Sequence, residues 1–291
     1  MVLVRSGVVL AATPLGDPDD ASFHLRQLLA EAPVIAAEDT RRLRDLVRRL
    51  GIKPTGRVVS FYDANEVGSI PDLLRAAGDG VVVVVSDAGT PLISDPGFPL
   101  VRAAIEVGIR VTCAPGPSAV IAALAVSGLP VQRFAFDGFV PRTAGPRGAW
   151  LESLRDDRRT VVAFDSPRRL ATTLDDAAAR LGPDRPACVA RELTKPHEEI
   201  LRGDLGWLAS LAGERDWLGE VVLLIGPGSP TEVKTSAEAD AVTRVLVLTL
   251  NGERLREAVD LVAGANGLSR RALYQAVLDA KSSAQSGPGA A

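Results

Sequence analysis

Cysteine and histidine are scarce in this chain of 291 residues, which has two of each. Two cysteines are too few for a disulfide framework, and Cys113 and Cys188 lack the spacing of metal ligands, so we expect both to be buried thiols. A zinc site or a Ser-His-Asp triad would need a histidine with partners, and neither His24 nor His197 has one nearby in the sequence. We therefore expect no metal site.

Long apolar stretches are also missing. No uninterrupted apolar run approaches the roughly 20 residues that span a bilayer. The run 8–12 is too short for a secretion signal and ends at Thr13 and Pro14. These absences predict a cytoplasmic protein without a membrane partner. The hydrophobic fraction of 46% is ordinary for a globular protein with a real core.

An excess of positive charge is absent, since the formal net charge is −3. This balance is not the signature of a nucleic-acid-binding protein, but the distribution of arginines matters more than their sum. Arginines crowd the stretches 41–49 and 142–159 and form two pairs, one at 168 and 169 and one at 270 and 271. Each group is either a solvated helix face or a local basic patch, and the sequence leaves both open.

Short β-branched runs alternate with longer amphipathic runs, which is typical of α/β architecture with a mainly parallel sheet. The five valines 81–85 have the pattern of a strand buried on both faces. We predict a first α/β domain over residues 1–115, and Thr40 is a possible N-cap within it. Its expected strands are 8–13, 34–36, 81–86 and 111–114, and its expected helices are 21–30, 40–50 and 97–107.

A second cycle of this kind predicts another α/β domain over residues 116–229. The segment 140–148 contains two prolines and two glycines and is expected to be a mobile loop. The Gly-, Pro- and Ser-rich segment 226–234 is a candidate linker. The expected strands are 134–136, 160–164, 187–190 and 220–225, and the expected helices are 118–127, 169–181 and 205–211.

The end of the chain has a different pattern. Two short amphipathic helices are predicted at 253–263 and 269–280, with Ser269 as N-cap of the second. They define a small helical, helix-turn-helix-like extension over 238–281, followed by a disordered tail over 282–291. Helical hairpins are more often packing units than readers of nucleic acid, so the role of this extension stays open.

Three unusual loops follow predicted strands, at the carboxyl ends where parallel α/β sheets bind ligands. They are 11–16 (AATPLG), 86–97 (SDAGTPLISDPG) and 115–119 (PGPSA). None carries the Gly-Lys-Ser/Thr ending of a P-loop or a dinucleotide-binding Gly-x-Gly-x-x-Gly. Their groups suit a ligand with adenosine, carboxylate and sulfonium parts better than a phosphate, although Gly/Pro-rich loops are commonly only turns.

In this order, the three loops resemble the tetrapyrrole-methylase superfamily of S-adenosylmethionine enzymes. The chain is more similar still to one branch, the RsmI family, over roughly residues 7 to 226. The segment 269–274 (SRRALY) resembles the helical extension of that family. Five further motifs carry the likeness: 36–41 (AAEDTR), 127–130 (SGLP), 138–141 (GFVP), 191–195 (RELTK) and 219–222 (GEVV).

This resemblance implies two α/β domains with S-adenosylmethionine in the cleft between them, and a homodimer. It implies 2′-O-methylation of a cytidine ribose in the decoding centre of 16S ribosomal RNA, with the assembled 30S particle as partner. The implied cofactor-binding residues are Pro14, Leu15, Gly16, Asp87, Ala88, Gly89, Thr90, Ile93, Ser118, Ala119 and Phe164.

The sequence departs from the family pattern at four positions near these motifs. Asp17 stands where the family usually has Asn, and Phe164 stands where it has Tyr. Asp165 replaces Glu, and Arg168 replaces His. These departures concern the fine detail of the pocket rather than the class of reaction.

Methyl transfer to a hydroxyl needs alignment of the reacting atoms and benefits from a nearby base. Glu38, Asp39 and Arg41 follow one predicted strand, and Glu192 and Lys195 follow another. We expect Asp39 or Glu192 to accept the proton, and Lys195 or Arg41 to hold a phosphate or lower the pKa of the hydroxyl. Acids also favour helix N-termini, so the stretch 38–40 could equally only cap the next helix.

Two other functions stay open from the sequence. A tetrapyrrole C-methyltransferase would use the same cofactor site, and its polyanionic substrate would suit the same arginines. A non-catalytic assembly factor that senses S-adenosylmethionine or a nucleotide would bind without turnover. If the substrate is RNA, the segments 41–49 and 140–159 and the arginines at 270 and 271 are the candidates for phosphate contacts.

Overall fold

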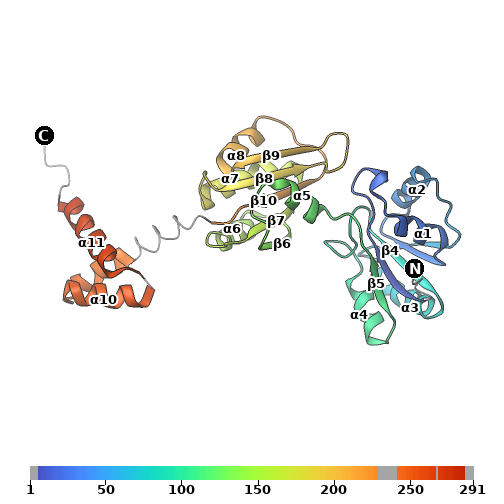
Figure 1. Cartoon of the computed structure of the whole chain (residues 1–291), viewed down its shortest axis with the longest axis horizontal. Helices are drawn as coiled ribbons and strands as arrows, with labels where there is room; N and C mark the ends of the chain where they lie inside the picture. Colours follow the sequence, from blue (N-terminus) through green and yellow to red (C-terminus); the bar gives the residue numbers. More distant parts are fainter. Residues whose placement is uncertain (1–5, 229–240, 267, 286–291) are drawn as a thin grey trace. The chain divides into compact units, whose positions relative to one another are not determined.

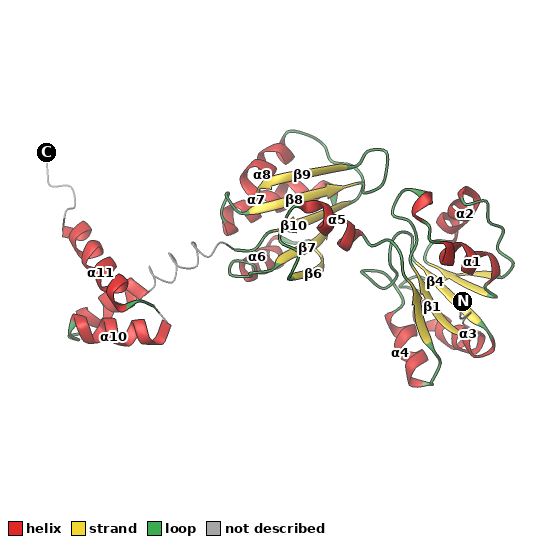
Figure 2. Cartoon of the chain, in the orientation of Figure 1, coloured by secondary structure: helices red, strands yellow, loops and turns green. Residues whose placement is uncertain are grey.

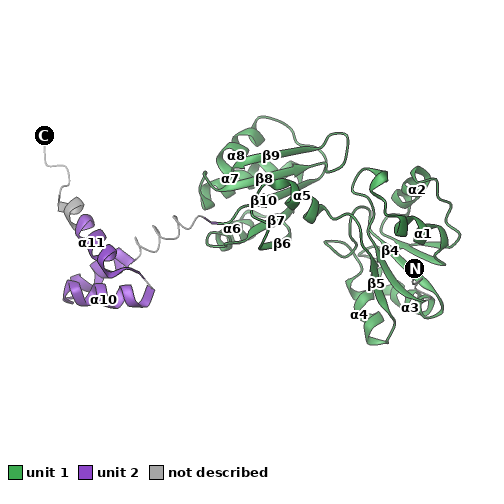
Figure 3. Ribbon diagram, in the orientation of Figure 1, with its two compact units in different colours: residues 1–227 green, residues 228–291 purple. Residues whose placement is uncertain are grey.

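The computed structural model describes residues 6–228, 241–266 and 268–285. The chain divides into two compact units, residues 1–227 and 228–291 (Figure 3). The larger unit contains two α/β lobes, each built on its own five-stranded sheet (Figure 1). In the smaller unit the described residues are helical apart from short connections (Figure 2). The domain boundaries expected from the sequence, 1–115, 116–229 and 238–281, stay predictions.

All strands of the first lobe run parallel, in the order β3-β2-β4-β1-β5. Successive side chains of a strand point to opposite faces, and the valine run of β4 follows this rule. Val83 and Val85 pack with α1 and α2, whereas Val82 and Val84 pack with α3 and α4. Both faces of the sheet are therefore covered. The elements are β1 (Gly7–Ala11), α1 (Phe23–Glu31), β2 (Val34–Ala37), α2 (Thr40–Arg49), β3 (Arg57–Ser60), α3 (Glu66–Asp79), β4 (Val81–Val85), α4 (Phe98–Glu106) and β5 (Val111–Ala114).

The sheet of the second lobe is mixed, in the order β6-β7-β10-β8-β9, and β6 with β7 is its parallel pair. Helices α6, α7 and α8 pack on one face, and α5 packs on the other. The elements are α5 (Ala119–Ser127), β6 (Phe134–Phe139), α6 (Ala144–Ser153), β7 (Thr160–Asp165), α7 (Leu170–Leu181), β8 (Pro186–Arg191), β9 (Glu199–Asp204), α8 (Leu205–Gly213) and β10 (Val221–Ile225).

A buried arginine connects the end of β10 with the end of α6. Arg185 is 2% exposed. Its guanidinium donates to the carbonyl oxygens of Gly226, Leu154 and Arg155 at 2.8, 3.0 and 3.0 Å. A buried charge is tolerated when hydrogen bonds replace those to water, and these carbonyls supply them.

Three local expectations for the larger unit were wrong. The segment 140–148 is not a loop throughout, because α6 begins at Ala144 and Pro146 lies in its first turn, where a missing N–H costs little. Cys113 is exposed because β5 is an edge strand, whereas Cys188 is buried as expected. The N-cap of α2 is Asp39 rather than Thr40.

The smaller unit packs the helix 241–250 with α10 (Leu255–Asn266) and α11 (Arg270–Gln285) around Val245, Val259 and Val277. The Ser269 hydroxyl accepts a hydrogen bond from the backbone N–H of Ala272 at 3.4 Å, the contact expected of its N-cap role. Since α11 continues through Gln285, residues 282–285 are helical rather than disordered. Residues 286–291 of the predicted tail and 229–234 of the predicted linker lie outside the described residues. Among the helices that the structure describes, none has the length and apolar character to cross a membrane.

Candidate active site

The three loops singled out from the sequence are bonded to one another at the carboxyl edge of the first sheet. Backbone hydrogen bonds of 2.9 and 3.0 Å join Thr13 and Gly89 in both directions. The Thr90 hydroxyl donates to the carbonyl oxygen of Pro117 at 3.0 Å, which connects the second loop to the third. Gly89 has a φ of 80°, which favours glycine, so this residue type allows the bridge.

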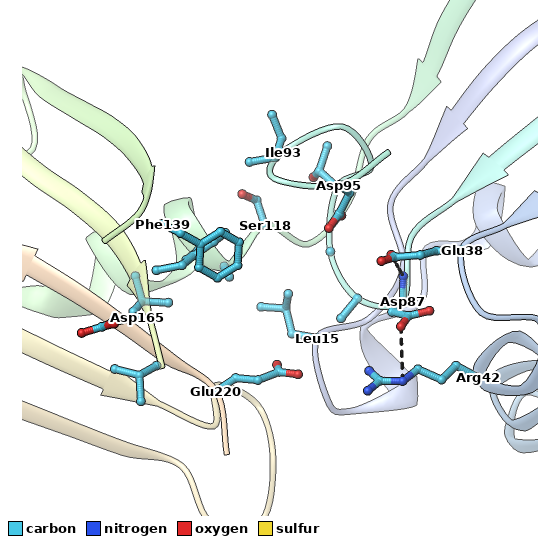
Figure 4. A pocket seen from close by; sticks show the side chains of 17 residues that line it. Leu15, Glu38, Arg42, Asp87, Ile93, Asp95, Ser118, Phe139, Asp165 and Glu220 are labelled. Atoms are coloured by element: carbon cyan, nitrogen blue, oxygen red, sulfur yellow. Dashed lines mark hydrogen bonds and ion pairs between the residues drawn. The ribbon is translucent and has the colours of Figure 1, made fainter. Parts of the chain in front are cut away.

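The loops form one side of a cleft of about 270 Å³ in the larger unit (Figure 4). The other side comes from the ends of β6 and β7 and the start of β10. Nine of the eleven predicted cofactor positions line this cleft: Leu15, residues 87–90, Ile93, Ser118, Ala119 and Phe164. The other two, Pro14 and Gly16, line a neighbouring cavity.

Three carboxylates lie along the first-lobe wall of the cleft (Figure 4). Glu38 follows β2 and accepts a hydrogen bond from the backbone N–H of Asp87 at 3.2 Å. The Asp87 carboxylate lies 3.3 Å from Nε of Arg42. Burial is the main cause that raises the pKa of Glu38, Asp87 and Asp95, and the neighbouring carboxylates raise each further. The pKa of Asp95 reaches about 7. Such a wall favours a cationic ligand, which would replace the lost hydration.

The second-lobe wall carries aromatic and apolar side chains beside the carboxylates of Asp165 and Glu220. The Phe164 ring meets Phe136 and Phe139 edge-on, with ring centroids 4.9 and 5.5 Å apart. Phe139 is 61% exposed, so its ring has free apolar surface. Val222 of β10 extends this wall. A flat aromatic group can pack here, opposite the carboxylates of the first-lobe wall.

The residues that depart from the family pattern have distinct local roles. Asp17 accepts a hydrogen bond from the backbone N–H of Asp19 at 2.9 Å and caps a short 3₁₀ turn. The Asp165 side chain is fully buried and lies 2.9 Å from the guanidinium of Arg169. Arg168 is exposed and has no ion pair among the described residues. Asp165 is thus a buried carboxyl next to Phe164 that pairs with Arg169, and its pKa is raised, mainly by burial.

Of the predicted catalytic residues after β2, Glu38 lines the cleft and Asp39 does not. Asp39 accepts a hydrogen bond from the Arg41 backbone at 2.7 Å, and its other oxygen lies 2.8 Å from the Arg41 guanidinium. The hydrogen bonds from Arg41 hold the pKa of Asp39 far below its ordinary value. Asp39 is therefore an ionised helix cap and a weak proton acceptor.

Glu192 and Lys195 form a tight turn against the first loop. Glu192 and Thr194 have φ values of 50° and 60°, unusual for residues with side chains. The Lys195 ammonium lies 2.9 Å from Glu192 and 3.2 Å from Glu220. A Cβ atom on Gly16 would collide with the Lys195 side chain, so glycine permits this approach. Burial favours a higher pKa for Glu192, but the hydrogen bonds from Lys195 and the Glu220 backbone outweigh it and lower the pKa.

The cleft is also lined by residues that the sequence did not single out, among them Arg42, Asp95, Phe139 and Glu220. Asp95, Phe139 and Glu220 lie within motifs that carried the family resemblance, which was the available signal. No group of three or more His, Cys, Asp or Glu side chains within the described ranges is arranged to hold a metal ion.

The fold and cleft correspond to a known class of enzymes. The family described as Tetrapyrrole (Corrin/Porphyrin) Methylases matches residues 7–209. Among solved structures, a uroporphyrin-III C-methyltransferase from Thermus thermophilus superposes with a TM-score of 0.55 at 20% identity, over 76% of this chain and 94% of that one. Diphthine synthase superposes with a TM-score of 0.58 at 18% identity, over 75% and 89%. At such identities the likeness shows the fold alone.

Relatives of higher sequence identity show which branch of this family the chain belongs to. The Ribosomal RNA small subunit methyltransferase I of Mycobacterium tuberculosis is 49% identical over 94% of this chain and 95% of its own length. The protein of the same name from Mesorhizobium japonicum is 40% identical over 98% and 96%. The RsmI C-terminal HTH domain family matches residues 235–281. The chain therefore belongs to the ribosomal RNA small subunit methyltransferase I family of the tetrapyrrole methylases, which confirms the predicted family and fold class.

Proposed function

We propose that the protein methylates the 2′-hydroxyl of a cytidine in the decoding centre of 16S ribosomal RNA, with S-adenosylmethionine as methyl donor. The observation that carries this proposal is the match to small-subunit rRNA methyltransferases over nearly the whole chain, C-terminal unit included. A solved protein of the same fold, with a TM-score of 0.54, was crystallised with S-adenosylhomocysteine. The alternative, methylation of a tetrapyrrole carbon, has only fold-level support at about 20% identity.

The cleft has the chemistry that S-adenosylmethionine needs. Its ammonium and sulfonium groups are cationic, and Asp95 and Asp87 supply the opposing negative charge. Its adenine is flat and largely apolar, and suits the wall formed by Phe164 and Phe139. The residues present thus fit this cofactor.

The cofactor supplies a methyl group on a positively charged sulfur, which is an excellent leaving group. The protein's main task is then to align the ribose oxygen with that methyl group. We assign proton acceptance to Glu38, because it lines the cleft and its pKa is raised, mainly by burial, which makes it a better base than an ordinary carboxylate. Asp39 and Glu192 are weaker candidates, since Arg41 and Lys195 keep both ionised.

The resemblance also supports a homodimer in the cytoplasm whose substrate is the assembled 30S particle. The test combines purified protein, methyl-labelled S-adenosylmethionine and small subunits from a strain that lacks this enzyme. Nuclease digestion and mass spectrometry then locate the label. A 2′-O-methylated cytidine in the decoding region is the expected result. If the protein binds the cofactor but transfers no label to the RNA, the assignment is overturned.

A further inference from the structure

A second cavity, of about 220 Å³, adjoins the cofactor cleft. The two share Leu15, Arg42 and Asp87 as a common wall. The rest of the second cavity is formed by the loop 14–18 and by residues 45–49 of α2. Pro14 and Gly16, two of the predicted cofactor positions, also line this cavity. Arg49 lines it as well and does not line the cofactor cleft.

Among the described residues, the charges in this cavity leave one arginine without an ion-pair partner. The Asp45 carboxylate lies 2.8 Å from Arg48, and Asp87 pairs with Arg42 through its Nε at 3.3 Å. Arg49 is exposed and makes no ion pair with any described residue. Both carboxylates of the cavity are therefore matched, and the guanidinium of Arg49 is available to an anion.

Two other cations that the sequence suggested for phosphate binding already form ion pairs with carboxylates. Arg41 pairs with Asp39 at 2.8 Å. Lys195 lies between Glu192 and Glu220 at 2.9 and 3.2 Å. A phosphate would have to displace a carboxylate from either of them, whereas Arg49 requires no such exchange.

We propose that this second cavity binds the RNA phosphodiester on the 3′ side of the methylated ribose, with Arg49 donating to its oxygens. This inference rests on the proposed function. The 3′-phosphate of a ribonucleotide is carried by the carbon next to the one that bears the 2′-hydroxyl, so its binding site must adjoin the site of methyl transfer. The shared wall of Leu15, Arg42 and Asp87 meets that requirement. A guanidinium has the planar fork that matches two phosphate oxygens, and such contacts fix the register of the RNA.

Arg44 provides a matched control for Arg49. Both are exposed arginines of α2 without an ion pair among the described residues, but Arg44 does not line the cavity. The experiment compares Arg49→Gln and Arg44→Gln with the unmodified protein. It measures S-adenosylhomocysteine affinity by calorimetry, and kcat/KM for small ribosomal subunits at several KCl concentrations.

We expect Arg49→Gln to lower kcat/KM for the subunits by about 10- to 100-fold, as for loss of a charge-assisted hydrogen bond. The slope of log kcat/KM against log KCl concentration should become shallower by about 0.7 to 0.9, which corresponds to one lost phosphate contact. Affinity for S-adenosylhomocysteine should be unchanged, which shows that the variant folds. Arg44→Gln should stay within about twofold of the unmodified protein, since it loses only long-range attraction.

Equal losses in the two variants would overturn the inference, because they would mean general attraction to RNA rather than a phosphate site. An Arg49→Gln variant as active as the unmodified protein would overturn it as well. If the unmodified protein binds the cofactor but does not label small subunits, the proposed function fails and the phosphate site falls with it. Equal losses in the two variants, or a fully active Arg49→Gln variant, would leave the proposed function intact.

Discussion

Replacing Asp95 by asparagine removes one negative charge from the cleft and hardly changes the size of the side chain. If this carboxylate holds a cationic end of S-adenosylmethionine, then only its ionised form binds well. Burial, and next the charge of Glu38, raise the pKa of Asp95 to about 7. In the free protein, the group is thus about half ionised at neutral pH.

The affinity of the unmodified protein should therefore rise with pH. Between pH 6 and pH 8 the ionised fraction of Asp95 grows from about one tenth to about nine tenths, so the dissociation constant should fall about tenfold. Asp95→Asn should not show this change. At pH 8 it should bind about 10- to 100-fold more weakly, since a hydrogen bond to a charged group contributes about 1.5–3 kcal/mol.

Stability without cofactor should respond in the opposite direction. The pKa of Asp95 in the folded protein, about 7, lies above its ordinary value of 3.8. The folded state therefore holds the proton more tightly, and the free energy of unfolding decreases as pH rises between these values. Asp95→Asn removes this penalty and should stabilise the cofactor-free protein at pH 8, by on the order of 2 kcal/mol after discounting for partial solvent exposure.

Calorimetric titration with S-adenosylmethionine at pH 6, 7 and 8 tests the binding, and thermal unfolding without ligand tests the stability. Asp72→Asn is a suitable control, because Asp72 is an exposed carboxylate on α3 that pairs with Arg75 and does not line the cleft. The reasoning is refuted if Asp95→Asn binds as tightly as the unmodified protein at pH 8. It is also refuted if the affinity of the unmodified protein does not change between pH 6 and pH 8.

Glu38→Gln should lower the rate of methyl transfer at saturating cofactor by about 10²- to 10⁴-fold, the usual contribution of a general base, as measured by label incorporation. Asp39→Asn should keep most of the activity in the same assay, because asparagine caps a helix about as well as aspartate; a loss as large as that of Glu38→Gln would contradict the assignment. Gly16→Ala should weaken cofactor binding in calorimetry, because its Cβ pushes the loop away from Lys195. Arg185→Met should lower the free energy of unfolding in urea by about 3 kcal/mol, since it leaves several buried carbonyl oxygens without donors; an unchanged midpoint would show that water replaces the guanidinium.

The shared position of the three loops could be predicted because each follows a parallel strand, and the carboxyl ends of parallel strands lie at one edge of a sheet. The strand order then brings these loops together, since β4, β1 and β5 are neighbours. Residues of the second lobe were harder to place. Glu220 and Phe139 reach the cleft through a mixed sheet, and the pairing of its strands depends on contacts distant in sequence.

Other misses have local causes. Glu38 and Asp39 are adjacent after β2, and successive side chains of an extended chain point in opposite directions, so one lines the cleft and the other caps α2. The turn that presents Asp95 passes through Leu92 and Ser94 at φ values of 73° and 68°, which no composition rule predicts. Strand β3 was missed because most of its residues are exposed and lack an apolar alternation.

The two walls of the cleft become available at different times during synthesis of the chain. Every strand of the first sheet has been made by Ala114, but Phe164 and Val222 belong to the opposite wall and follow much later. A nascent chain can therefore fold its first lobe while it has no place for the methyl donor. Since a ligand stabilises only the state that binds it, the methyl donor proposed above would stabilise completed chains over interrupted ones. Truncated products of an aborted translation event gain no such protection, and cellular proteases can remove them selectively.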